Sequence, residues 1–176
     1  MGNIVRINPA VPQPEAEFPH ATEDCILSPN STAEVIGTVD HADLAASVEG
    51  SVQPSLQAAF GHLLIRSPYG KCHVASGAMT RSLSAINVNT ANVTFYVDSY
   101  DPEKPKLRAR VADGGLLYDV TVPASTQRKI WKEDGLEAVL NEIRCTDRAQ
   151  LRVGLCRAFG GKCYAQVNGI IAIPNE

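Results

Sequence analysis

The sequence predicts a mainly β fold with minor α-helix, arranged as two small barrels in tandem. Short alternating segments rich in Val, Ile, Thr and aromatic residues recur along the chain, as is typical of strands. Glycine pairs at 114–115 and 160–161 indicate tight turns between such segments. The order in the second half is three strands, a helical connection and two strands, and the first half repeats it faintly.

The first half gives weaker strand signals than the second. A proline-rich, acidic stretch follows the first strand and is expected to be an extended surface connection. A turn at 28–31 should separate the second strand from the third. Asp40 is a suitable N-cap for one short helix, and Pro54 a suitable start for another. The strands expected here are 3–7, 24–27, 34–39, 71–75 and 82–88.

The second half has clearer alternation. Its helices should be a short one capped by Ser125 or Thr126, and one capped reciprocally by Asp134 and Glu137. Gly160-Gly161 is a good type I′ turn pair for a final hairpin. The strands expected here are 93–97, 106–111, 116–122, 151–158 and 162–173. From the strand faces and the helical stripe we expect one shared core of Phe95, Leu107, Val120, Val139 and Leu140.

Three strands, a helical connection and two strands form the connectivity of an OB-fold, a small Greek-key barrel. Segment 70–73 resembles 161–164, and 3–5 resembles 92–94, at offsets of about 90 residues. We therefore expect two OB-like lobes: a degenerate N-terminal lobe with two short helices, 1–88, and a C-terminal lobe, 89–176.

Charge and cysteine usage narrow the function classes. The net charge of −3 gives no global positive field, but residues 89–176 carry 12 basic side chains against 11 acidic ones. We therefore expect any site for an anionic partner to lie in the second half of the chain. The five cysteines show no C-x-x-C spacing, so we expect free thiols and neither a zinc site nor a disulfide framework. Without a signal sequence or a long apolar run, the expected location is cytoplasmic, with no membrane partner.

Two basic groups are candidate nucleic-acid contacts. In the first, Lys106, Arg108 and Arg110 alternate on one strand, and Tyr96 could stack on a base. The alternative is a solvated outer face on which these basic side chains form ion pairs with Asp119 and Asp98, and such exposed ion pairs add little to stability. In the second, Arg152 and Arg157 lie around the last hairpin with Arg148 and Lys162, where surface charge is the alternative.

No residue pattern supports catalysis or metal binding. One cluster could suggest a metal, but its two histidines are 21 residues apart and turn structure explains its carboxylates better. That cluster consists of His20, Glu23, Asp24, His41 and Asp43. Ser76 or Ser82 as nucleophile, with His73 as base, is also considered, but neither serine lies in a nucleophile-elbow motif. We expect no enzyme, no cofactor and no metal.

Short motifs spread over nearly the whole chain carry a family resemblance. They are His20-Ala21-Thr22-Glu23-Asp24, Arg81-Ser82-Leu83, Leu107-Arg108-Ala109-Arg110, Tyr118-Asp119-Val120 and Arg152-Val153-Gly154-Leu155-Cys156-Arg157, the last followed by Cys163-Tyr164. In these the chain resembles the dual OB-containing domain of bacterial proteins. The resemblance implies a component of a bacterial conflict or anti-phage defence system, with nucleic-acid binding proposed from the fold.

The function expected is a non-catalytic recognition module that binds single-stranded DNA or RNA within such a defence system. The alternative is a protein–protein adaptor or assembly subunit that holds an effector partner of the system. Fold analogy does not choose between them, because OB-folds bind oligonucleotides, oligosaccharides and proteins.

Overall fold

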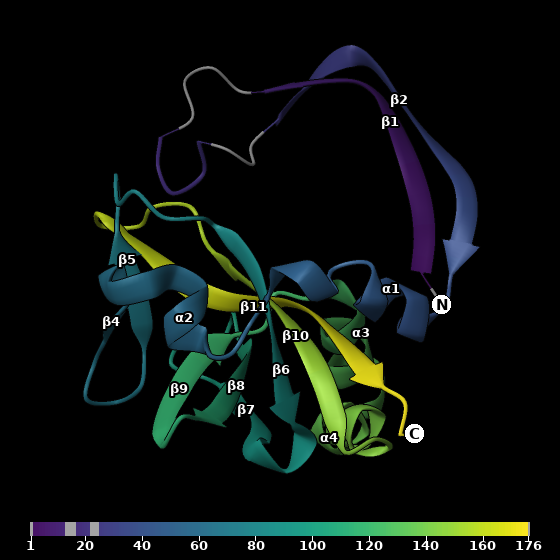
Figure 1. Ribbon diagram of the computed structural model, residues 1–176. Helices are drawn as coiled ribbons and strands as arrows, with labels where there is room; N and C mark the ends of the chain where they lie inside the picture. The colour runs from purple at the N-terminus through teal and green to yellow at the C-terminus, as the bar shows by residue number, and fades with distance from the viewer. Residues whose placement is uncertain (1, 13–16, 22–24, 176) are drawn as a thin grey trace.

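The structure is a computed structural model that describes residues 2–12, 17–21 and 25–175 of the 176-residue chain. Its strands are β1 (Gly2–Pro12), β2 (Cys25–Val39), β3 (Val52–Gln53), β4 (Ile65–Arg66), β5 (Cys72–Ala75), β6 (Leu83–Asn89), β7 (Val93–Asp98), β8 (Lys106–Asp113), β9 (Leu116–Thr121), β10 (Arg148–Leu155) and β11 (Lys162–Ile173). Its α-helices are α1 (His41–Ala46), α2 (Leu56–Phe60), α3 (Ser125–Asp134) and α4 (Leu136–Arg144), with 3₁₀ turns η1 (Glu49–Ser51), η2 (Gly61–Leu63) and η3 (Thr90–Asn92). The fold is therefore mainly β with minor helix, as expected (Figure 1).

The main sheet has the strand order of an OB-fold. Its strands follow one another as β3-β6-β10-β11-β9-β8-β7, and β9 pairs with β11 in parallel through Thr121 and Gln166. β6 and β7 lie at opposite ends of the path β6-β10-β11-β9-β8-β7, yet they are consecutive in the chain and joined only by η3. Together they serve as one interrupted first strand, so the sheet curves back on itself. The order expected for the second half, with α3 and α4 between the third and fourth strands, is confirmed.

Strand β6 links the two halves of the chain. It pairs antiparallel with β10 from Leu83 opposite Gly154 to Asn89 opposite Arg148. Of the segments that resemble each other in sequence, 70–73 and 161–164 also pair, since Tyr164 on β11 lies opposite His73 on β5. Segments 3–5 and 92–94 pair with other strands. The division into lobes 1–88 and 89–176 stays a prediction.

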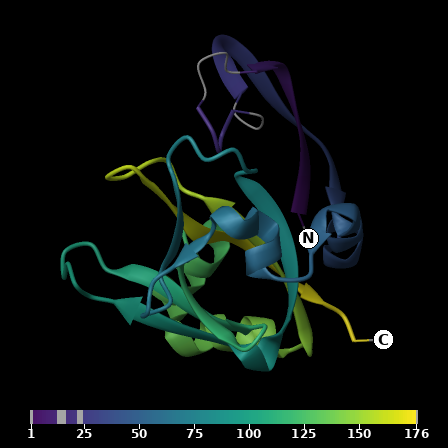
Figure 2. The same cartoon turned by 60° about the vertical axis from the view of Figure 1, so that its left-hand side comes forward.

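Strands β1 and β2 form a two-stranded arm that arches away from the barrel (Figures 1 and 2). The expected turn at 28–31 is wrong, because residues 25–39 form one strand. Asn8 pairs with Thr32 and Ala10 with Leu27, so residues 28–31 bulge opposite a single residue of β1. The backbone of these turn-forming residues is therefore accommodated in a bulge. β1 continues through its prolines to Pro12, which an edge strand tolerates.

The expected core is confirmed. Phe95, Leu107, Val120 and Val139 are buried in one cluster, and Leu140 packs against it half-buried. Strand alternation and the stripe of α4 thus place the apolar side chains as the sequence indicates. In the described part of the chain, no helix combines the length and the apolar character that crossing a membrane requires.

Helix caps follow the sequence only in part. The Asp40 carboxylate accepts a hydrogen bond from the Asp43 N–H at 2.8 Å and caps α1, as expected. The caps expected from Ser125 or Thr126 and from Asp134 are wrong, since Ala124 and Gly135 occupy the N-cap positions and make no side-chain cap. Asp134 is the last residue of α3, so its side chain belongs to the preceding helix.

The described cysteines form no disulfide, as expected. Cys72 and Cys163 are buried, Cys156 is half-buried and Cys145 is exposed, all four as free thiols. The side chain of Cys25 lies outside the described residues. Both glycines of the final turn have positive φ, 58° at Gly160 and 74° at Gly161, as a type I′ hairpin requires.

Replacing Phe95 with Ala should lower the free energy of unfolding by about 3–5 kcal/mol, because the ring is buried and its loss leaves a cavity. Chemical denaturation of the two proteins measures the difference. Leu116→Ala, at an exposed position of β9, is the control and should change stability little. A loss below about 1 kcal/mol at Phe95 would contradict the assigned core.

Candidate ligand groove

A groove of about 700 Å³ lies on the barrel face formed by β8 and β9. Loop 99–105, between β7 and β8, borders it, as does loop 156–161, between β10 and β11. The lining residues are Lys71, Cys72, Asp98, Tyr100, Asp101, Lys104, Lys106, Arg108, Asp119, Thr121, Cys156, Phe159, Tyr164 and Ala165. The second and third strands of an OB-fold, with the loops after its first and fourth strands, are the usual ligand face.

Aromatic rings line this groove, two of them on the bordering loops. Tyr100 is 97% exposed and Phe159 is 78% exposed, so neither ring is used to build the core. Tyr164 on β11 is half-buried, and its ring centroid lies 5.5 Å from that of His73 at an angle of 47°. Sequence reasoning missed all three rings. They lie in the loops after the first and fourth strands and in the last strand of the expected OB-fold. Because those loops border the usual ligand face, these positions could have identified the rings as candidate ligand contacts.

The floor of the groove is a buried hydrogen-bonded ion pair. Arg108 Nε donates to Asp119 Oδ1 at 2.9 Å, and the side chains are 8% and 9% exposed. The Tyr96 hydroxyl donates to the same carboxylate at 2.8 and 2.9 Å. Arg108 Nη2 also donates to the Asp119 carbonyl at 3.2 Å, which ties the guanidinium to the backbone of β9.

The pKa values of these groups reflect the closed environment. Burial alone would lower the pKa of Arg108, but the hydrogen bond and charge of Asp119 outweigh it and raise the pKa. Burial and the hydrogen bond to Asp119 raise the pKa of Tyr96. Burial, reinforced by the charge of Asp119, raises the pKa of the Cys72 thiol to about 12. The guanidinium is therefore charged and the thiol is neutral at physiological pH.

The three cations expected to share a solvated face have three different surroundings. Lys106 is exposed at the edge of the groove. Arg110 is also exposed and places its guanidinium carbon 4.8 Å from the centroid of the Tyr96 ring. Arg108 is only 7% exposed, so the expectation that it faces solvent is wrong. Its partners are those of the alternative interpretation, Asp119 and, at 4.0 Å, Asp98.

The groove includes no member of the second expected basic group, neither Arg152 and Arg157 nor Arg148 and Lys162. Arg152 is half-buried on β10, and its Nη2 donates to the Leu44 carbonyl at 3.3 Å, which ties the strand to α1. Arg157 is exposed in loop 156–161. Tyr96, expected to stack on a base, has its hydroxyl bonded to Asp119 and lies beneath Arg110.

The residues considered for metal binding or catalysis have structural contacts. His20 Nε2 lies 3.2 Å from the Cys156 carbonyl, and Ser82 is buried. Burial and the nearby charge of Lys162 lower the pKa of His73. Glu23 and Asp24 lie outside the described residues. Within residues 2–12, 17–21 and 25–175, no three His, Cys, Asp or Glu side chains gather as metal ligands do.

Arg108→Met should lower the free energy of unfolding by about 3–5 kcal/mol, because Asp119 would be left as a buried, unpaired charge. Lys106→Met, at an exposed position of the same strand, is the control and should stay within about 0.5 kcal/mol of wild type. Urea denaturation of both variants measures this. Equal effects of the two substitutions would contradict the buried ion pair.

At pH 8 a thiol-specific alkylating reagent should modify Cys145 and leave Cys72 unmodified in the folded protein. A thiol with a pKa of about 12 is ionised to only about one part in 10⁴ at that pH, and the thiolate is the nucleophile. Cys145 is exposed. Peptide mass spectrometry after timed quenching measures the two rates. Comparable rates would show that Cys72 is not held in a closed environment.

Comparison with known proteins gives one family match. The model of the family described as "Dual OB-containing domain" matches residues 1–170. No curated protein and no solved structure matches the chain. The match covers the arm, both loops that border the groove and the barrel as far as residue 170 of β11.

Proposed function

Because the chain belongs to the dual OB-containing domain family, a class of binding module, we propose that it binds single-stranded nucleic acid in the groove over β8 and β9. The observation that carries this proposal is the pair of exposed rings, Tyr100 and Phe159, on the two loops that border the groove. Exposed aromatic rings beside an OB-fold face are suited to stacking on unpaired bases.

Charge in the groove supports stacking as the main source of affinity there. The groove is lined by four basic and three acidic side chains, and the buried Arg108–Asp119 pair accounts for one of each. The exposed ammonium groups of Lys71, Lys104 and Lys106 are left to contact phosphates. Stacking tolerates any base, since every base has a π-face, so the proposed binding is weakly sequence-dependent and open to DNA and RNA.

The proposal contains no catalytic step and no cofactor. Cys72 and Cys156 are thiols that line the groove, but a pKa of about 12 makes Cys72 a poor nucleophile at physiological pH. The resemblance to components of bacterial anti-phage systems suggests a cytoplasmic defence system as the setting of this binding.

A protein–protein adaptor is the second candidate, and the β1–β2 arm favours it. Val5 pairs with Val35, and Ile7 with Ala33, so these side chains share one face of the arm. Val5, Ile7 and Val35 are all exposed. An apolar face on a two-stranded arm suits an effector protein that would cover it.

Tyr100→Ala and Phe159→Ala should each weaken binding of single-stranded DNA or RNA by about 1–3 kcal/mol, or about 5- to 150-fold in Kd, through lost stacking. Fluorescence anisotropy with labelled oligonucleotides at low salt measures this. Tyr69→Ala is the matched control, because Tyr69 is 87% exposed and is not among the groove-lining residues.

Two results would contradict the nucleic-acid proposal. One is an absence of binding by the wild-type protein to either DNA or RNA at low salt. The other is equal weakening by Tyr69→Ala and the two groove variants. The first result favours the adaptor, whose apolar interface would give binding to its partner that depends little on salt. The second would place the bound strand elsewhere than in the groove.

A further inference from the structure

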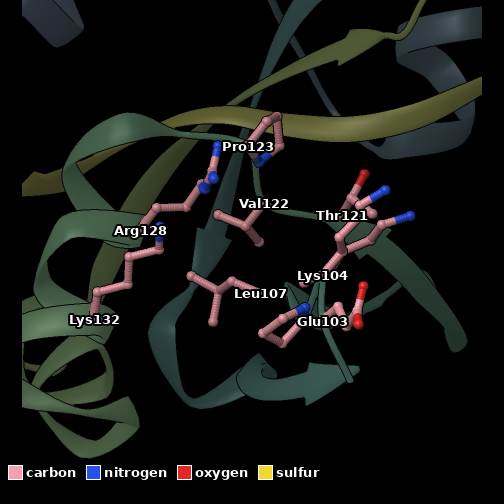
Figure 3. A pocket seen from close by; sticks show the side chains of 10 residues that line it. Glu103, Lys104, Leu107, Thr121, Val122, Pro123, Arg128 and Lys132 are labelled. Atoms are coloured by element: carbon pink, nitrogen blue, oxygen red, sulfur yellow. The ribbon is translucent and has the colours of Figure 1, made fainter. Parts of the chain in front are cut away.

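A second hollow, of about 480 Å³, lies on the other side of loop 99–105, between that loop and α3. Its floor is apolar and includes Leu107 and Val122, both 2% exposed. Figure 3 shows Arg128 and Lys132 on one side of this floor and Lys104 on the other. The hollow therefore combines an apolar base with cations on opposite sides.

The charge around this hollow is unbalanced. Four basic side chains line it, Lys104, Lys106, Arg128 and Lys132, against one acidic side chain, Glu103. All four basic residues are exposed, and none forms an ion pair with a carboxylate of the described residues.

Helix α3 keeps two of these cations one turn apart. Arg128 and Lys132 lie at i and i+4, where like charges destabilise a helix. On the same helix Lys129 does have a partner, since its Nζ lies 4.0 Å from Glu133 Oε2. The unpaired cations of α3 are thus those that border the hollow, and an anionic ligand would relieve their repulsion.

The second hollow continues from the groove. Lys104, Lys106 and Thr121 line both, so the two meet along loop 99–105, the start of β8 and the end of β9. The two parts differ in chemistry. The groove has aromatic rings and nearly balanced charge, whereas the second hollow has three more basic than acidic side chains.

We propose that the phosphate backbone of a bound single strand leaves the groove beside Lys104 and Lys106 and continues into the second hollow, where Arg128 and Lys132 bind its phosphates. This inference rests on the proposed function, since it extends the same bound strand. The groove rings hold bases by stacking, and α3 supplies most of the phosphate contacts. Because Arg128 and Lys132 are about 6 Å apart along the helix, each can reach a different phosphate.

The test compares Arg128→Gln/Lys132→Gln with wild type, using labelled oligothymidylates of about 5 and about 15 nucleotides over a range of salt concentrations. The short strand is held by the groove alone and tests the proposed function separately. For the long strand, the variant should bind about 2- to 30-fold more weakly at low salt. Its log–log salt slope should be shallower by about 1.4, the value for two lost phosphate contacts.

Lys129→Gln/Arg144→Gln is the matched control. It removes one lysine and one arginine from exposed positions on α3 and α4 that do not line the hollow. It should bind the long strand with the wild-type salt slope. Thermal melting of both double variants establishes that each remains folded.

Three results would overturn the inference, in distinguishable ways. A wild-type salt slope for Arg128→Gln/Lys132→Gln would leave the groove proposal standing and remove the path over α3. An equal change in the control would assign the effect to net charge. Failure of the wild-type protein to bind either strand would remove the proposed function itself.

Discussion

The buried ion pair between Arg108 on β8 and Asp119 on β9 connects the parts of the barrel that form the groove. The Asp119 carboxylate accepts hydrogen bonds from Arg108 and from Tyr96 on β7. Its backbone N–H donates to the Gly70 carbonyl at 2.9 Å, which brings the segment before β5 to the same place. Through its carboxylate and its backbone N–H, Asp119 thus connects three neighbouring strands and the segment that leads into a fourth. Removing its cation would leave a charge in a poorly solvated site.

The close approach at Gly70 is part of this arrangement. Gly70 has φ of 86°, and a Cβ atom there would lie 2.8 Å from the Leu117 carbonyl. Only glycine therefore lets the segment reach β9 and place Lys71 beside Asp119 at the groove. Because Arg108 is already paired with Asp119, the ligand contacts proposed for the groove fall to exposed side chains at its edges. In the proposed binding mode, stacking and phosphate contacts are therefore separated in space, over the groove and over α3.

Local sequence patterns were sufficient for most elements of the barrel and for its core. Alternation predicts β7, β8 and β9, and it places Phe95 and Leu107 inside, because successive residues of a strand face opposite sides. The glycine pair at 160–161 predicts the last hairpin, since a type I′ turn needs positive φ at both positions. The Asp40 cap likewise depends only on residues within one turn of the chain.

By itself, the sequence determined the OB-fold order and the face to which each strand residue belongs. Only the tertiary structure decided what covers that face. Lys106, Arg108 and Arg110 occupy alternate positions of β8 and so belong to the same face by pattern. Arg108 alone is enclosed, because cross-strand neighbours from β7 and β9 surround it. Residues far apart in sequence, such as Tyr100 and Phe159, or Lys104 and Lys132, come to border one groove or one hollow through loop and helix placement. That placement depends on long-range packing, on which periodicity and spacing within a segment carry no information.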